Sequence, residues 1–149
     1  MMLVPDTPSV EQLSQVIVQV TAPSFLLGAV AGFVSLLISR MNRVTDRIQA
    51  AEAVPDGDHA RARLKRDMPQ LRRRAELLNR AILFSTTSAI LTCLLVIVAF
   101  VSAYYQLRHE YGVAVLFVIA LAFFTAGLVN LVRETWISVH EYESGSLAP

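Results

Sequence analysis

Three long, uncharged and apolar stretches dominate the pattern of hydrophobic and polar positions along the chain. They cover residues 22–39, 81–105 and 113–132, and none contains Asp, Glu, Lys or Arg. A helix of about 20 residues crosses the ~30 Å hydrocarbon core of a bilayer. The pattern therefore predicts an all-α integral membrane protein with three transmembrane helices over these ranges.

The segment before the first stretch has an amphipathic pattern. Ser9 and Gln12 fit a capping box, in which each side chain bonds a free backbone N–H of the first helical turn. Apolar residues then fall on one helical face. We expect a short helix over 9–20 on the outer membrane surface, with Pro23 breaking or bending the chain after it. The face comprises Val10, Leu13, Ile17 and Val20.

Residues 40–80, between the first and second stretches, are polar and still have a helical pattern. Residues 40–53 contain no Gly or Pro and can extend the first helix, and 54–58 have the composition of a turn. Pro69 predicts a kink or restart in the arm that follows. The pattern favours a helical hairpin projecting from the membrane. Apolar residues of its second arm alternate intervals of four and three: Leu64, Met68, Leu71, Ala75, Leu78 and Ile82.

The distribution of positive charge predicts the orientation. Eleven of the 13 Lys and Arg residues lie within 40–80, although the net charge of the chain is only +1. Short loops rich in Lys and Arg stay in the cytoplasm. We therefore expect the hairpin and the tail at 133–149 inside, and the N-terminus outside.

Arginines cluster at the inner ends of the first two stretches. Arg40, Arg43 and Arg47 share one helix face, and Arg73 and Arg74 precede the second stretch. Such residues bind anionic lipid phosphates, or they form a basic rim around the inner vestibule of an oligomer. Acidic residues interspersed in the same loop argue against nucleic-acid binding.

Glu134 follows the third stretch at the depth of Arg40 and Arg43. We expect an interfacial ion pair between Glu134 and one of these arginines, which would connect the third helix to the first. The alternative is an exposed carboxylate at a helix end.

Small and hydroxylated residues mark two further faces. Gly28, Gly32, Ser35 and Ser39 form a small-residue face that allows close helix packing, within a protomer or between protomers. The hydroxyls of the second stretch either line a narrow polar path or bond their own backbone and a neighbouring helix. They belong to Ser85, Ser88 and Thr92.

Nothing in the sequence indicates catalysis. No nucleophile–base pair is evident, the single cysteine is Cys93, and the three histidines lack metal-ligand spacing. We expect no enzymatic activity, no cofactor and no metal.

The chain resembles a widespread family of small bacterial membrane proteins that is classed only as a domain of unknown function. The resemblance spans residues 10–140 and rests on four features: Pro23, the run Arg40-Met41-Asn42-Arg43 with Asp46-Arg47, the run Arg73-Arg74-Ala75, and Glu134. It implies a three-span protein of the bacterial inner membrane and supplies no activity.

Two functions are consistent with these observations. The first is a homo-oligomeric channel or pore-like assembly, because three helices alone enclose no cavity and the small-residue face favours close packing. The second is a structural or accessory subunit of a larger membrane complex, docked through the cytoplasmic hairpin.

Overall fold

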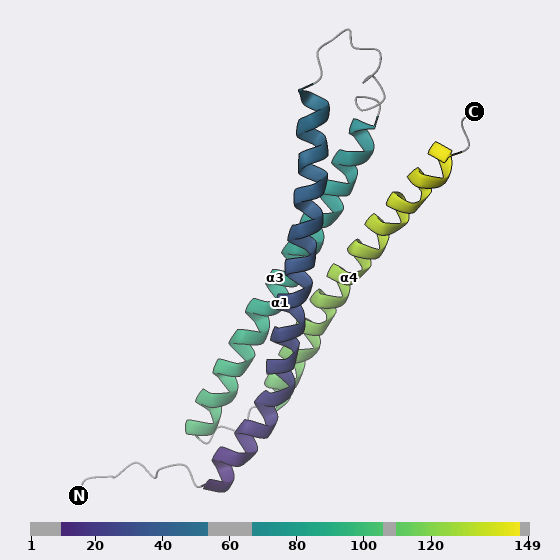
Figure 1. The fold of residues 1–149 in the computed structure, drawn as a ribbon. Coiled ribbons are helices and arrows are strands. Elements are labelled where there is room, and N and C mark those ends of the chain that lie inside the picture. The colour runs from purple at the N-terminus through teal and green to yellow at the C-terminus, as the bar shows by residue number, and fades with distance from the viewer. Residues whose placement is uncertain (1–9, 54–66, 106–109, 147–149) are drawn as a thin grey trace, which may run out of the picture.

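The computed structural model describes residues 10–53, 67–105 and 110–146, which are almost entirely helical. Helix α1 spans Val10–Glu52, α3 spans Met68–Tyr104 and α4 spans Glu110–Ser146. The helices run up, down and up, so consecutive helices are antiparallel (Figure 1). The expected capping residue Ser9, the turn at 54–58, Leu64 and the end of the C-terminal tail lie outside the described residues.

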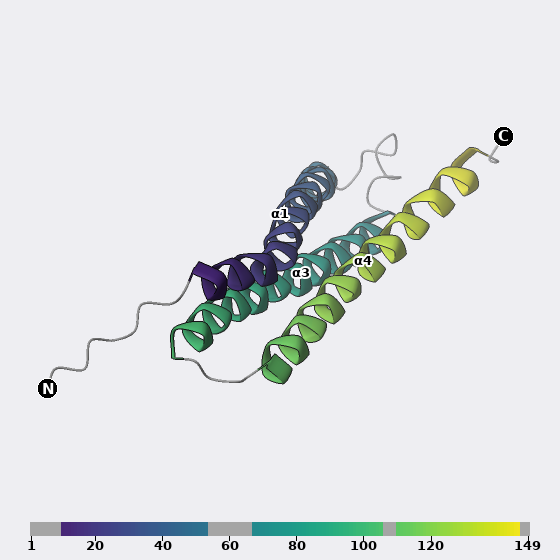
Figure 2. The ribbon, with the colours of Figure 1, turned by 90° about the horizontal axis from the view of Figure 1, so that it is seen from below.

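Helix α1 continues without a break through Pro23, so the segment expected to form a separate helix over 9–20 is the N-terminal part of α1 instead. Figure 2 shows a change of direction between its purple N-terminal part and its blue remainder. Proline removes one backbone hydrogen bond and bends a helix. Adjacent hydroxyls donate to the backbone four residues back, Thr21 to the Ile17 carbonyl and Ser24 to the Val20 carbonyl, each at 2.8 Å. The proline therefore produces a bend in a continuous helix.

Helix α3 begins at the restart expected from Pro69. The backbone carbonyl of Asp67 accepts bonds from the amides of Gln70 at 3.1 Å and Leu71 at 3.0 Å. Pro69 thus lies in the first helical turn, where its missing N–H would have no intrahelical partner.

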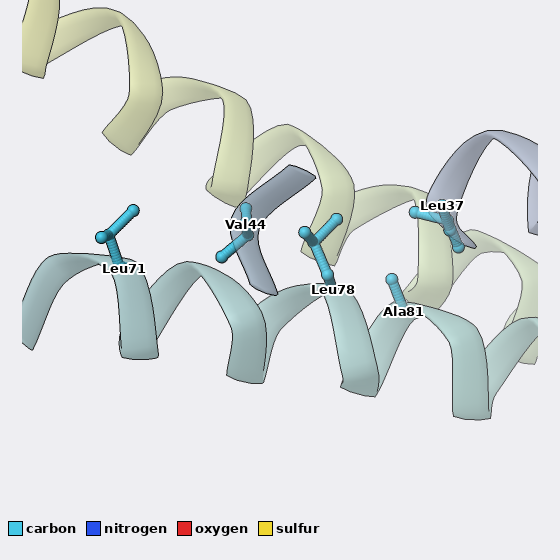
Figure 3. Packing of buried hydrophobic residues seen from close by; sticks show 5 residues of the cluster. All are labelled: Leu37, Val44, Leu71, Leu78 and Ala81. Atoms are coloured by element: carbon cyan, nitrogen blue, oxygen red, sulfur yellow. The ribbon is translucent and has the colours of Figure 1, made fainter. Parts of the chain in front are cut away.

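A repeat of seven residues packs α1 against α3. Leu71 and Leu78 of α3 are buried against Leu37 and Val44 of α1, and Ala81 extends the same cluster (Figure 3). Seven-residue spacing keeps one face of each helix directed at its partner over many turns. Among the α1 side chains that the structure describes, the buried ones are those of Pro23, Val30, Leu37, Val44 and Ala51.

Small residues bring α4 close to α3. Within 111–139 of α4, the buried residues are Ala120, Gly127 and Glu134, which are also seven apart. Ser88 of α3 donates to the Ala120 carbonyl at 2.7 Å, a bond between a side chain and a neighbouring backbone that requires close approach. Helix α3 packs along both neighbours, whereas α1 and α4 meet at few places. One of these is the edge-to-face contact of Phe33 with Phe124, with ring centroids 5.4 Å apart.

Large apolar side chains cover much of the outer surface. Phe25 of α1, Ile90 of α3 and Val118 of α4 are 76%, 56% and 63% exposed. Three segments, Val20–Glu52, Met68–Ser102 and Tyr111–Val139, are long and apolar enough to cross a membrane. Because burial inside the protein removes few of these side chains from solvent, a hydrocarbon environment accounts for the outward apolar surface.

Candidate functional site: an ionic cluster that joins the three helices

Glu134 of α4 is the centre of an ionic cluster that involves all three helices. Its carboxylate is 1% exposed and accepts a hydrogen bond from Arg40 Nη1 of α1 on Oε2 at 2.8 Å. Arg74 of α3 contacts the other oxygen, Oε1, through Nη2 at 2.8 Å and Nε at 3.0 Å. One buried carboxylate therefore links α1 to α3 through α4.

The two arginines differ in exposure. The side chain of Arg74 is 11% exposed, whereas that of Arg40 is 39% exposed. Arg40 Nη1 also donates to Thr135 Oγ1 at 3.1 Å, and Thr135 donates in turn to the Leu131 carbonyl at 3.0 Å. The guanidinium of Arg40 is therefore held by hydrogen bonds to α4 through Nη1, while the rest of it is partly exposed to solvent.

The cluster forms because the seven-residue repeat brings its members to one level. Glu134 follows Gly127 by seven residues, and Arg40 follows Phe33 by seven. Gly127 faces Phe33 of α1 and Ala81 of α3, and Ala81 lies seven residues after Arg74. In the next layer of the bundle, the same repeat places Glu134, Arg40 and Arg74 side by side. A buried carboxylate is stable there because both of its oxygens are hydrogen-bonded to charged donors.

The structure distinguishes between the two expected partners of Glu134 and adds a third arginine. It brings Arg40 and Glu134 together, whereas Arg43 is exposed and forms no ion pair with Glu134 among the described contacts. Three residues turn a helix by about 300° and advance it by about 4.5 Å, so Arg43 points outward and one turn beyond the carboxylate. Arg74, which was expected on a basic rim, lies inside the cluster. Arg47 and Arg73 are exposed.

The small-residue face of α1 does not pack within the protomer. Gly28, Gly32, Ser35 and Ser39 are all exposed. A Cβ built on Gly28 or Gly32 meets nothing within 4 Å. This face lies on the side of α1 opposite its buried seven-residue repeat, so its surroundings lie outside the protomer.

The hydroxyls considered as a polar path are buried between α3 and α4, and each donates its proton to a backbone carbonyl. Ser85 donates to the Ala81 carbonyl at 2.8 Å, Thr92 to the Ser88 carbonyl at 2.8 Å, and Ser88 to Ala120. All three side chains are 0% exposed. The path is therefore closed within a protomer, because a packed helix covers these hydroxyls.

Gly127 is a packing residue that the sequence reasoning missed. An added Cβ would lie 2.6 Å from Ser85 Oγ and 3.3 Å from the Ala81 carbonyl oxygen. The available signal was the seven-residue spacing of Ala120, Gly127 and Glu134. No sequence pattern indicated Thr135, which accepts a hydrogen bond from Arg40.

The described residues contain no group of three or more His, Cys, Asp or Glu side chains that could hold a metal ion. The contacts within the cluster are charge-assisted hydrogen bonds between helices. Together, the outward apolar surface and this internal ionic cluster define a multi-pass membrane protein.

The chain belongs to a family described as a protein of unknown function (DUF2721), which matches residues 20–144. This range includes all of α3, most of α1 and α4, and every residue of the cluster. Neither the curated proteins nor the solved structures contain a match to the chain.

Proposed function

We propose that this protein is a homo-oligomeric assembly of the bacterial inner membrane that forms a pore-like path between subunits. The observation that carries the proposal is the exposed face formed by Gly28, Gly32, Ser35 and Ser39. Small residues allow membrane helices to approach closely, and serine hydroxyls bond across such contacts. A second copy of α1 offers the matching surface.

The position of this face favours contact between copies over contact with lipid. Apolar side chains such as Leu36, which is 48% exposed, flank it and suit acyl chains. Ser35 and Ser39 form no hydrogen bond within the described residues, whereas Thr125, also exposed, bonds the Leu121 carbonyl at 2.9 Å. Two serine donors in a hydrocarbon layer would gain partners in an oligomer.

A path for ions or small solutes would then run along α1 rather than through a protomer. The hydroxyls between α3 and α4 are closed off, whereas the α1 face carries glycines and serines that tolerate water. Arg40, Arg43 and Arg47 come after this face in the sequence, but the helical period turns them to one side of it, so they lie beside the contact between copies.

Imaging in nanodiscs and flux from liposomes test the pore directly. A closed ring with α1 around a continuous axial path, together with ion flux from liposomes, is the expected result. An isolated protomer in nanodiscs, or a ring whose liposomes release no ions, would contradict the proposed function.

Replacing Gly32 with leucine tests the interface without disturbing the protomer. Because nothing lies within 4 Å of a Cβ at this position, Gly32→Leu should fold normally and dissociate the oligomer in detergent. The mass of the protein–detergent complex measures this effect. Gly112→Leu is the matched control, since Gly112 of α4 is equally open, and it should leave the mass unchanged. Wild-type mass for Gly32→Leu would place this face against lipid.

The orientation proposed here has the N-terminus outside and the C-terminus in the cytoplasm, because eleven of the 13 Lys and Arg residues lie within 40–80, at the end of the bundle where α1 ends and α3 begins. Single cysteines in a Cys93→Ala background should report it. Positions 6 and 109 should react with an impermeant thiol reagent from outside, and positions 56 and 145 only after permeabilisation. Reaction of position 56 in intact cells would reverse the orientation.

A second candidate is an accessory subunit that docks a partner through a cytoplasmic helical hairpin. The observation in its favour is that α1 and α3 remain packed beyond the ionic cluster, with Ala51 and Leu71 0% and 5% exposed. Charged side chains cover the outside of these arms, including an ion pair of Arg72 with Glu52 at 3.4 Å. This candidate predicts a stoichiometric partner in mild detergent and no ion flux from the protein alone.

A further inference from the structure

Three arginines form a flank on α1 beside the ionic cluster. Arg40, Arg43 and Arg47 are spaced by three and four residues, so they lie within about 60° of one another and span about 10 Å along the helix. Arg43 and Arg47 are exposed. We call these residues the arginine flank. The acidic Asp46 is also exposed, and it lies on the neighbouring side of α1, beyond Arg43.

The buried carboxylate of Glu134 orients the first member of the flank. Arg40 uses one nitrogen, Nη1, for both Glu134 and Thr135. Its Nε and Nη2 have no hydrogen-bond acceptor among the described residues, and the side chain is 39% exposed. A guanidinium has five N–H donors arranged in a planar fork. Arg40 therefore presents donors toward the outside from a fixed position.

The arginine flank lies at the depth of a lipid headgroup. Arg40 directly follows the uncharged run that ends at Ser39. On α4, Trp136 is 67% exposed two residues after Glu134, and exposed tryptophans favour the membrane interface. On α3, Arg80 contacts Glu76 one turn closer to the same end of the bundle at 2.6 Å, as expected of an arginine that extends toward water.

We infer that the arginine flank binds the phosphate of an anionic phospholipid in the adjacent leaflet. Guanidinium groups donate paired hydrogen bonds to phosphate oxygens. Arg40 supplies a pre-oriented donor pair, and Arg43 and Arg47 supply charge on its open side. A lipid fits this position better than a dissolved anion, because its acyl chains can cover the exposed apolar surface of α1. This inference does not require an oligomer.

The test measures lipid binding by the full chain in nanodiscs and by native mass spectrometry. Wild type should retain phosphatidylglycerol in preference to phosphatidylcholine. The double variant Arg43→Gln with Arg47→Gln should reduce that preference roughly tenfold or more. Both side chains are exposed and outside the contacts of Glu134, so thermal unfolding in phosphatidylcholine should not change.

The matched control removes the same charge elsewhere. Arg73 of α3 and Arg133 of α4 are exposed as well, and Arg73→Gln with Arg133→Gln should keep most of the preference. Inorganic phosphate, added at the same concentration as the lipid phosphate, should not compete. Equal losses in the two double variants would show diffuse attraction and overturn the site. Competition by inorganic phosphate would overturn the lipid assignment.

Discussion

Glu134→Gln should markedly lower the thermal stability of the purified protein in detergent. The substitution keeps the shape of the side chain and removes its charge, which leaves two arginines without their shared carboxylate. Breaking a buried pair costs about 3–5 kcal/mol and breaking an exposed one about 0–1 kcal/mol. Arg74 is 11% exposed and Arg40 39% exposed. We therefore expect a loss near the lower end of the buried range, about 3 kcal/mol.

Double variants distinguish a shared cluster from separate contacts. Arg74→Gln should add little once Glu134→Gln is present, because the two substitutions remove the same interaction. Glu76→Gln is the matched control. Its ion pair with Arg80 joins residues that are 60% and 59% exposed, so its loss should be much smaller. Additive losses for Glu134 and Arg74 would show that the cluster does not act as a unit.

The sequence predicted the spans because charge is excluded from them, and the structure confirms three helices that are long and apolar enough to cross a membrane. The sequence predicted the ends of the helices less well. Helix α1 extends through Pro23 because the proline removes only one backbone hydrogen bond, and the hydroxyls of Thr21 and Ser24 donate to backbone carbonyls beside it. Helices α1 and α3 continue past the apolar runs because Leu71 and Val44 extend the seven-residue repeat.

The ionic cluster was predicted in part. The depth of Glu134 beyond its span indicated a partner near Arg40, since both residues follow uncharged runs at the same end. The contact of Arg74 with Glu134 was not predicted, because Arg74 lies several residues before the uncharged stretch of its helix. Its depth relative to Glu134 therefore did not follow from the position of that stretch. Its contact depends on the rotation of α3 relative to α4, which the packing of Gly127 and Ala120 determines.

The glycines show most clearly that a sequence motif for helix contact does not identify the glycine that a neighbouring helix covers. The spacing of Gly28 and Gly32 matched a common motif of membrane helix contacts, yet both are open in the protomer. Gly127 has no such motif, yet a Cβ added to it would lie 2.6 Å from Ser85 Oγ of α3. Which glycine a neighbouring helix covers depends on the residues that face it, here Ser85 and Ala81.

Gly127→Ala should destabilise the protomer itself. The new Cβ would lie 2.6 Å from Ser85 Oγ and 3.3 Å from the backbone oxygen of Ala81. Ser85 is 0% exposed and bonded to that same oxygen at 2.8 Å, so moving either group costs packing or a hydrogen bond. Overpacking a well-packed core costs about 1–3 kcal/mol, and Gly127→Leu should cost more. Thermal unfolding in detergent measures the loss.

Removing the obstructing hydroxyl should partly rescue this variant. In Ser85→Ala with Gly127→Ala, the nearest clashing atom is gone and only the Ala81 oxygen remains close. The double variant should therefore be more stable than the sum of the two single losses predicts, and such coupling identifies direct contact. Gly112→Ala is the control, because a Cβ there meets nothing within 4 Å. If Gly127→Ala unfolds at the wild-type temperature, α3 and α4 are farther apart than this packing requires.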